Sequence, residues 1–268
     1  MLGIGKSIRL ERIIDRNTQK SVIVPMDHGV TMGPIKGIVD MRDMVNEIAE
    51  GGANAVLGHI GLPLHGHRKH GRDIGLILHL SGSTVWAPDP NAKVLVNTVE
   101  MALKIGADAV SVHINIGAES ESDMLKDLGQ VSIKCHEWGM PLLAMMYTRG
   151  EKFSNELSAE GIKHAARIAA ELGADIVKVS YPGSKDGFAQ VVKGCPIPVV
   201  IAGGEKAEDD REVFQIIKDS IDVGGCGVSI GRNAFQHENK RAMVKAICAI
   251  VHEGLSVDEA LEILNASS

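Results

Sequence analysis

A lysine lies inside the apolar run Gly173–Tyr181, where a charged side chain is unexpected. The β-branched residues Ile176, Val177 and Val179 around it are typical of a parallel strand that is buried on both faces. Burying an unpaired ammonium group is costly, so Lys178 must reach solvent near the strand end, pair with a carboxylate, or lose its proton. A deprotonated lysine attacks carbonyl carbon, which is the starting point of Schiff-base chemistry.

Two further residues are of the types that Schiff-base aldol chemistry requires. That chemistry needs a carboxylate to handle protons at the carbinolamine and another group near the cleaved bond. Asp27 follows an apolar stretch in Val-Pro-Met-Asp-His-Gly, and Tyr147 ends another apolar run. Taken alone, Asp27 also fits a loop carboxylate that caps backbone amides, and Tyr147 fits a packing tyrosine. Their convergence with Lys178 on one end of a barrel favours the catalytic interpretation.

Two glycine-containing turns predict an anion site. Gly203 and Gly204 end the stretch Val-Val-Ile-Ala-Gly-Gly, and Gly231 precedes Arg232 in Val-Ser-Ile-Gly-Arg-Asn. In a barrel of alternating strands and helices, the last two such loops often hold phosphate through their backbone N–H groups. Arg232 adds a charged donor, so the pair of turns implies a phosphorylated substrate.

The segment His65–Arg72 is rich in histidine and basic residues. Its spacing matches no standard zinc pattern, and no cysteine or acid accompanies it before Asp73. A mobile basic loop is therefore favoured over a metal site. Arg68, Lys69 and Arg72 could attract a phosphate or a carboxylate, and this loop is the only candidate in the sequence for a second anion site.

The elements that must position these residues are short apolar runs spread over the whole chain. Helical periodicity fills several gaps between them, as in Met41, Met44, Val45 and Ile48. Strand–helix alternation with eight strands predicts an α/β fold, a single (β/α)8 TIM barrel, whose active site lies at the carboxyl ends of the strands. The eight runs are Ser21–Met26, Ala55–His59, Gly75–Leu80, Ala109–Ile114, Leu142–Tyr147, Ile176–Ser180, Val199–Ala202 and Gly227–Ile230.

Local signals mark where helices begin and end. Ser158 is a plausible N-cap, Gly173 a helix end, and Ser256 with Glu259 forms a capping box. Similar Gly-Ala connectors precede the second, fourth and sixth runs, which fits either a two-strand repeat or a common connector. No linker or change of composition divides the chain, so we expect one domain over residues 1–268.

The composition restricts the class of protein. Of the 268 residues, 44% are hydrophobic and 23% charged, which is ample for a globular core. A net charge of −6 gives no support for binding nucleic acid. No apolar run reaches the length of a membrane span, and the first residues lack a signal-peptide core. Four scattered cysteines indicate free thiols. We therefore expect a soluble cytoplasmic protein.

In their order along the chain, these motifs resemble the archaeal class I aldolase family (DeoC/FbaB type). That family includes fructose-bisphosphate aldolases and 2-amino-3,7-dideoxy-D-threo-hept-6-ulosonate synthases. The segments around Gly37, Val56, His67 and Ser81 look closest to the synthase branch, and Met145 stands where the aldolase branch often has tryptophan. The resemblance implies a Schiff base at Lys178, a proton-transfer carboxylate and a proton donor. It implies substrate contacts at Asp27, His28, Gly29, Val30, Thr31, Tyr147, Thr148, Arg149, Gly203, Gly204, Gly231 and Arg232.

The resemblance also implies a reaction. A transaldolase-type synthase would take 6-deoxy-5-ketofructose 1-phosphate as donor and L-aspartate semialdehyde as acceptor, in aromatic amino acid biosynthesis by the 3-dehydroquinate route. Lys178 would carry the imine, and neither a metal nor another cofactor is needed because the iminium accepts the electrons. Family members form large rings, so a homo-oligomer is expected.

Two alternatives remain open at this stage. A class I fructose-bisphosphate aldolase would use the same residues and cleave a phosphorylated ketose to small aldehyde products. A non-catalytic sugar-phosphate sensor would keep the anion site alone. A lysine in a buried strand counts against the sensor, since binding does not call for an amine there.

Overall fold

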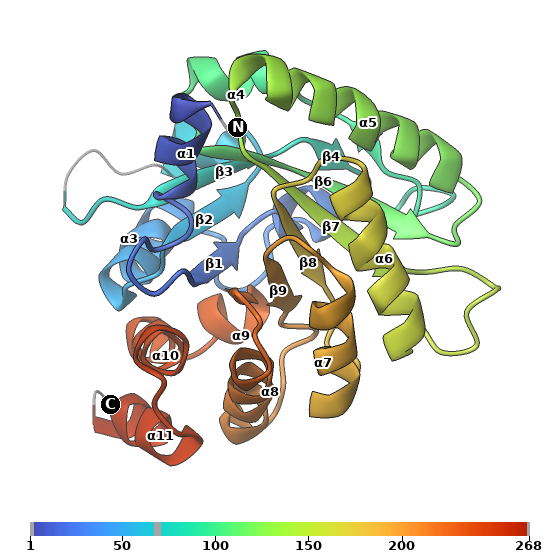
Figure 1. Cartoon of the computed structure of the whole chain (residues 1–268). Helices are drawn as coiled ribbons and strands as arrows, with labels where there is room; N and C mark the ends of the chain where they lie inside the picture. Colours follow the sequence, from blue (N-terminus) through green and yellow to red (C-terminus); the bar gives the residue numbers. More distant parts are fainter. Residues whose placement is uncertain (1–2, 67–70, 267–268) are drawn as a thin grey trace.

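The computed structural model describes residues 3–66 and 71–266, and its centre is a closed barrel of eight parallel strands (Figure 1). The strands follow one another around the barrel in the order β1-β10-β9-β8-β7-β6-β3-β2. This confirms the predicted (β/α)8 architecture. The strands are β1 Ser21–Pro25, β2 Ala55–Gly58, β3 Gly75–His79, β6 Ala109–Ile116, β7 Leu142–Thr148, β8 Ile176–Val179, β9 Val199–Ala202 and β10 Gly227–Ser229.

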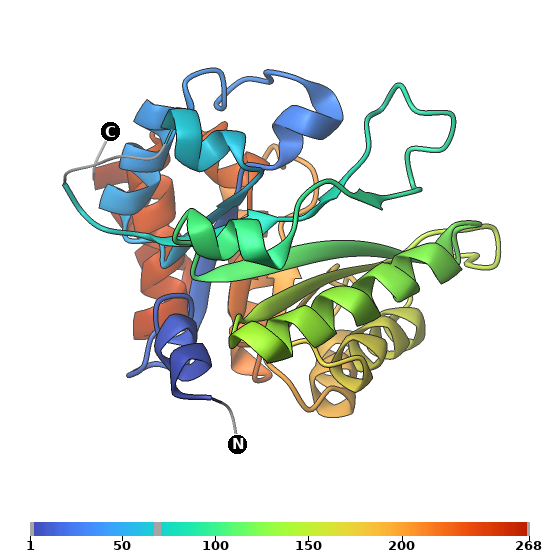
Figure 2. The same cartoon turned by 90° about the horizontal axis from the view of Figure 1, so that it is seen from above.

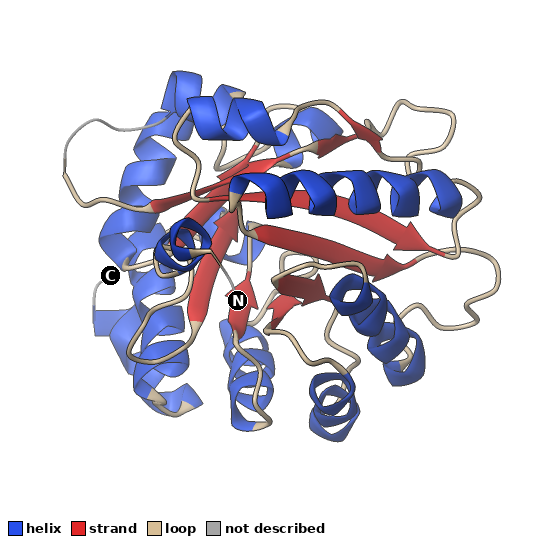
Figure 3. Ribbon diagram, turned by 45° about the horizontal axis from the view of Figure 1, so that its top comes forward, coloured by secondary structure: helices blue, strands red, loops and turns tan. Residues whose placement is uncertain are grey.

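Helices surround the barrel and connect one strand to the next (Figure 3). After each barrel strand the chain forms at least one helical segment, and the last three helical segments pack together beside β1 and α3. The segments are α1 Ile4–Leu10, α2 His28–Met32, α3 Met41–Gly51, η1 Leu62–Gly66, α4 Val99–Lys104, α5 Glu121–Trp138, α6 Ala159–Glu171, α7 Lys185–Gly194, α8 Asp210–Asp222, α9 Arg232–Phe235, α10 Lys240–Cys248, η2 Ala249–Glu253 and α11 Val257–Ala266.

The predicted elements agree with the observed ones to within a residue or two. The largest difference is in β6, which continues to Ile116 rather than ending at Ile114. Ser158 caps α6 by accepting from the Gly161 N–H, and Ser256 and Glu259 cap α11 reciprocally. The connector glycines Gly52, Gly106 and Gly173 have φ values of 102°, 76° and 88°, a left-handed conformation that favours glycine.

Two apolar layers hold the barrel together. The larger layer lies between the outer faces of the strands and the helices, and Met44, Val45 and Ile48 of α3 belong to it as predicted. The smaller layer fills the barrel interior and includes Ile23, Leu57, Ile77, Leu143, Met145, Ile176 and Val200. Ile13, fully buried, packs against this interior layer. The interior is therefore a solid core below the site, as is usual for this architecture.

A small antiparallel pair, β4 (Ser81–Gly82) and β5 (Val94–Leu95), lies outside the barrel. The loop that joins them extends beyond the strands (Figure 2). The Val96 N–H donates to the Leu80 carbonyl, which fixes the base of this hairpin to the end of β3.

Two further observations concern the chain as a whole. Cys135, Cys195, Cys226 and Cys248 are all free. Among the described residues, no helix combines the length and the hydrophobicity that a membrane-spanning segment needs.

Candidate active site

A cavity of about 700 Å³ opens at the carboxyl ends of the barrel strands. The three predicted catalytic residues, Asp27, Tyr147 and Lys178, all line it. Of the other predicted contacts, seven also line it: His28, Thr31, Arg149, Gly203, Gly204, Gly231 and Arg232. Strands on all sides of the barrel thus contribute to one site.

Lys178 lies at the floor of this cavity, and 6% of its surface is exposed. Its register partners are Met145 of β7 and Val200 of β9, both members of the interior layer, so its side chain continues the inward series that begins with Ile176. Within the described part of the chain, no carboxylate lies within 4.0 Å of its ammonium group and no hydrogen-bond partner is present. A buried amine facing a polar cavity is well placed to meet a carbonyl carbon.

Asp27 faces Lys178 from the first turn after β1. Its carboxylate is 3.7 Å from His28 Nδ1 and 3.9 Å from His79 Nε2. Burial opposes ionisation of Asp27, but its electrostatic interactions with His79, His28 and Lys178 outweigh burial and lower the pKa of Asp27 to about 2. The carboxylate is therefore ionised at neutral pH and can accept a proton during carbinolamine chemistry.

Two buried histidines on neighbouring barrel strands complete this wall. Burial lowers the pKa of His79 to about 4 and that of His113 to about 3, so both rings are neutral at pH 7. His79 Nδ1 is 2.8 Å from Ser111 Oγ, and His113 Nε2 is 2.9 Å from Asn115 Oδ1. The His113 ring lies beside the Tyr147 ring, with centroids 4.9 Å apart. These contacts fix the rings around the reacting centre.

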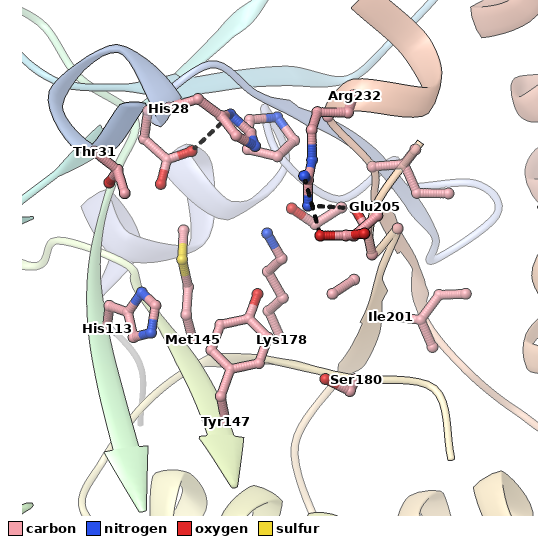
Figure 4. A pocket seen from close by; sticks show the side chains of 18 of the residues that line it. His28, Thr31, His113, Met145, Tyr147, Lys178, Ser180, Ile201, Glu205 and Arg232 are labelled. Atoms are coloured by element: carbon pink, nitrogen blue, oxygen red, sulfur yellow. Dashed lines mark hydrogen bonds and ion pairs between the residues drawn. The ribbon is translucent and has the colours of Figure 1, made fainter. Parts of the chain in front are cut away.

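The two predicted glycine turns meet on the other side of Lys178 (Figure 4). Arg232 Nη2 donates to the Gly204 carbonyl, and Nη1 is 3.8 Å from the exposed carboxylate of Glu205. Asn233 ties the turns together, because its amide donates to the carbonyls of Gly203 and Glu205 and accepts from the Ala207 N–H. The buried Nε of Arg232 has no protein partner among the described residues, which leaves a donor for a ligand.

Three of the predicted substrate contacts are not among the residues that line the cavity. Thr148 alternates with Tyr147 along β7 and donates its hydroxyl to the Glu156 carbonyl, outside the barrel. Gly29 faces Ile38, and Val30 faces the strand pair at Gly82. We therefore assign no side-chain contact with substrate to Thr148 or Val30, and Gly29, which has no side chain, does not line the cavity.

The basic segment predicted as an alternative anion site is only partly described. Arg68, Lys69 and the two histidines at 67 and 70 lie outside the described residues, and His65 belongs to η1. Arg72 lies beside Gly52 and Cys248, at the end of α3, and does not line the cavity. Arg72 is thus excluded from the site. Within the described ranges, no cluster of three or more metal-ligating side chains is present.

Several cavity residues were not predicted from the sequence. Lys93, Asn91 and Ser83 come from the loop between β4 and β5, and His113 and Asn115 from β6. The alternation His113, Asn115 within an apolar strand was a usable signal, because polar residues two apart share one face. The loop carries no comparable pattern, since its position over the cavity depends on the hairpin outside the barrel.

Comparison with known proteins agrees with this geometry. Residues 21–237 match the model of the DeoC/LacD family aldolases. The chain belongs to this family. It is 43% identical over 97% of both chains to a 2-amino-3,7-dideoxy-D-threo-hept-6-ulosonate synthase of Halobacterium salinarum. It is 39% identical to a 2-amino-4,5-dihydroxy-6-oxo-7-(phosphonooxy)heptanoate synthase of Streptomyces griseus, over 92% of this chain and 90% of that one.

The fold of the family extends to a solved Schiff-base-forming fructose-1,6-bisphosphate aldolase. That structure superposes with a TM-score of 0.85 at 28% identity and covers 92% of this chain and 99% of its own. The family assignment thus rests on both the sequence and the fold, and the relatives include both enzyme types that the sequence motifs had indicated.

Proposed function

We propose that this protein is a Schiff-base synthase that makes 2-amino-3,7-dideoxy-D-threo-hept-6-ulosonate from 6-deoxy-5-ketofructose 1-phosphate and L-aspartate semialdehyde, in aromatic amino acid biosynthesis. The observation that carries the proposal is the amine of Lys178, buried at the cavity floor with no carboxylate of the described residues within 4.0 Å. The enzyme acts on a phosphorylated ketose and a small aldehyde. A cytoplasmic location and a homo-oligomeric state stay predictions.

The products named for the two synthase relatives support the choice of acceptor. Each is a seven-carbon 2-amino acid with a ketone at C6 and hydroxyl groups at C4 and C5. In such a compound an aldol reaction forms the C4–C5 bond, because C5 is next to the ketone and C4 bears the hydroxyl. The C1–C4 fragment is then a four-carbon amino acid with an aldehyde, which is aspartate semialdehyde. The two products differ only at C7, so the relatives share an acceptor and differ in the donor.

The reaction begins at Lys178, whose amine adds to the C5 ketone of the donor and loses water to give an iminium. The C3–C4 bond then breaks. Its electrons pass into the iminium to form an enamine, the C3 hydroxyl loses its proton, and a three-carbon aldehyde that carries the phosphate leaves. The enamine attacks the aldehyde of the semialdehyde, and the new alkoxide takes up a proton. Water finally releases the product ketone and the amine.

The surrounding residues manage the protons of this sequence. Asp27 is ionised and accepts and returns the protons that carbinolamine formation and dehydration require. Tyr147 lies beside Lys178 on the neighbouring strand β7 (Figure 4). There its hydroxyl exchanges a proton with the oxygen attached to the carbon at which the C–C bond breaks and forms. It accepts a proton in cleavage and donates it in addition.

The second candidate is fructose-bisphosphate aldolase, because a Schiff-base aldolase of that type shares the fold at 28% identity. Both enzymes use the same lysine, so the donor and the acceptor, and not the lysine, separate them. Incubation with the donor and either L-aspartate semialdehyde or glyceraldehyde 3-phosphate, followed by mass analysis, decides between them. We expect the amino-sugar acid from the semialdehyde and little cleavage of fructose 1,6-bisphosphate. Efficient bisphosphate cleavage without the amino-sugar acid would contradict the proposal.

A further inference from the structure

The cavity contains a second pair of cations, Lys93 and Arg149, apart from the glycine turns at Arg232. Lys93 comes from the loop between β4 and β5, and Arg149 follows β7 directly. The Arg149 guanidinium carbon is 5.7 Å from the centroid of the Tyr147 ring. Both side chains line the same cavity, and burial of Lys93 together with the charge of Arg149 lowers the pKa of Lys93.

Neither cation forms an ion pair with a residue that the structure describes. Among the described residues, no carboxylate lies within 4.0 Å of Lys93 or Arg149, whereas Arg232 has Glu205 at 3.8 Å. The Lys93 ammonium group donates to Ser83 Oγ and to the Pro90 carbonyl, at 2.9 Å for the latter. An ammonium group has three N–H donors, so one remains for a ligand. Asp27 and Asp89 act on Lys93 only from beyond ion-pair distance, so two cations without a close described carboxylate share one polar cavity and favour an anion.

The loop that carries Lys93 is held in place on both sides. Ser83 Oγ donates to the Pro90 carbonyl at 2.8 Å, which closes the loop on itself. Asn115 of β6 donates to the Asn91 carbonyl at 2.8 Å, which fastens the loop to the barrel. The same Asn115 lies 2.9 Å from the His113 ring. Lys93 is therefore positioned before any ligand arrives, which reduces the entropy lost on binding.

The two anion sites lie on opposite sides of Lys178. Around the barrel, β6 is diametrically opposite β10, and β8, which carries Lys178, lies between them. The Arg232 turn follows β10, while Lys93 is tied to β6. Figure 4 shows the corresponding separation of His113 and Arg232 on the two sides of the Lys178 side chain. A substrate bound to Lys178 can thus extend toward either site.

The position of Tyr147 sets the direction of the reacting chain. Tyr147 lies on the β7 side of Lys178, toward Lys93 and Arg149. If its hydroxyl exchanges a proton with the reacting oxygen, the part of the substrate beyond the breaking and forming C–C bond extends to that side. The other substituent of the imine carbon then points toward Gly204 and Arg232. In the donor proposed above this other substituent is a methyl group, so the donor phosphate is on the reacting side.

We propose that Lys93 and Arg149 form one anion subsite that is used twice in each turnover. It first holds the phosphate of the three-carbon aldehyde that leaves, and then the carboxylate of the incoming amino-acid aldehyde. Both anions lie at nearly the same distance along the carbon chain from the imine carbon, so one pair of cations serves both. The donor fragment stays on Lys178 throughout, so only the anion bound to Lys93 and Arg149 is exchanged during turnover. This inference rests on the proposed function, and Lys93 is its specificity-determining residue.

The test compares the Lys93→Met variant with the parent enzyme in two half-reactions. We expect kcat/KM to fall roughly 10- to 150-fold both for cleavage of 6-deoxy-5-ketofructose 1-phosphate and for addition to L-aspartate semialdehyde, because each loses a charged hydrogen bond. Lys93→Arg should recover most of both. Lys126→Met, on the exposed face of α5, should match the parent. Borohydride trapping of hydroxyacetone, which carries no anion, should be equal in all four proteins and shows that the fold and Lys178 are intact.

Each other result overturns the inference or its premise in a distinguishable way. Unchanged kcat/KM for both substrates in Lys93→Met, with normal trapping, would overturn the subsite. A fall in kcat/KM for only one of the two substrates, the phosphorylated donor or the semialdehyde, would overturn its double use. If the parent enzyme makes nothing from the semialdehyde, the proposed function fails, and glyceraldehyde 3-phosphate then replaces it as acceptor. A lower kcat/KM of Lys93→Met with glyceraldehyde 3-phosphate would then assign Lys93 to phosphate binding only, which also overturns its role in binding a carboxylate.

Discussion

His79 Nε2 lies 3.9 Å from Asp27 Oδ2, so a buried neutral imidazole faces a half-buried carboxylate across the cavity wall. The other ring nitrogen of His79 is held by Ser111 Oγ at 2.8 Å. The two groups differ in charge state, because burial lowers the pKa of His79 to about 4 while Asp27 has its pKa lowered to about 2. Between about pH 4 and neutral pH the site therefore keeps an ionised Asp27 and an uncharged His79 ring.

This arrangement predicts how stability depends on pH. In the unfolded chain His79 titrates near 6.5, whereas in the folded protein its pKa is about 4. As pH falls from 6.5 to 4, the unfolded state takes up a proton that the folded state does not, so the free energy of unfolding decreases. His79→Gln should make this decrease shallower by up to about 1.4 kcal/mol per pH unit.

Urea unfolding at a series of pH values between 4 and 7 measures this slope. His136→Gln, on the exposed part of α5, is the matched control and should give a curve parallel to that of the parent. Parallel curves for His79→Gln and the parent would mean that the pKa of His79 is the same in the folded and unfolded protein, which would contradict this prediction.

Tyr147→Phe should slow bond cleavage and formation without preventing imine formation. Removing a positioned proton donor typically costs about 10²- to 10⁴-fold, and we expect kcat to fall within this range. Borohydride trapping of hydroxyacetone on Lys178 should stay within about twofold of the parent, because the imine forms without Tyr147. A variant that loses trapping as strongly as turnover would instead place Tyr147 in imine formation.

Asn233→Ala should loosen both glycine turns, since its buried amide makes three hydrogen bonds to the loop after β9. We expect the free energy of unfolding to fall by roughly 1–3 kcal/mol. Gln236→Ala removes a single, exposed hydrogen bond from the side-chain amide to the Lys36 carbonyl. Its loss should lower the free energy of unfolding by less than about 1 kcal/mol. Equal losses in urea unfolding would show that Asn233 has no special role in the turns.

Arg232→Ala should weaken the binding of ketones whose phosphate is next to the carbonyl. Dihydroxyacetone phosphate carries its phosphate on the side of the Gly204 turn, so its dissociation constant should rise roughly 10- to 150-fold. Hydroxyacetone should be trapped equally well by the variant and the parent. Titration of both ketones with borohydride quench gives the two constants, and an equal loss for both would mean that Arg232 supports Lys178 rather than the phosphate.

The sequence alone was sufficient to predict the barrel and to single out Lys178, for different physical reasons. The eight strands repeat one local pattern of apolar residues, and each active-site end is fixed by the parallel topology. Lys178 is a charged residue inside an apolar strand pattern, and this contrast identified it from the sequence. Gly231 and Arg232 followed from the same topology, because the last two loops of a barrel are neighbours.

Lys93 could not be found in this way. It is a surface-like lysine in a polar loop, and only the hairpin of β4 and β5 brings it to the cavity. Arg72 shows the opposite case, since it is close to a histidine-rich motif but lies beside Gly52, away from the cavity. Thr148 was grouped with its neighbour Tyr147 but does not line the cavity, because adjacent residues in a strand face opposite sides.

The most direct test of the central claim is covalent trapping at Lys178. The enzyme is incubated with hydroxyacetone and borohydride, digested, and its peptides are analysed by mass spectrometry, with Lys178→Ala treated in parallel. We predict that the reduced adduct is found on Lys178, that activity is lost in proportion to it, and that Lys178→Ala has neither adduct nor activity. An adduct on another lysine, or turnover by Lys178→Ala, would contradict the Schiff-base mechanism.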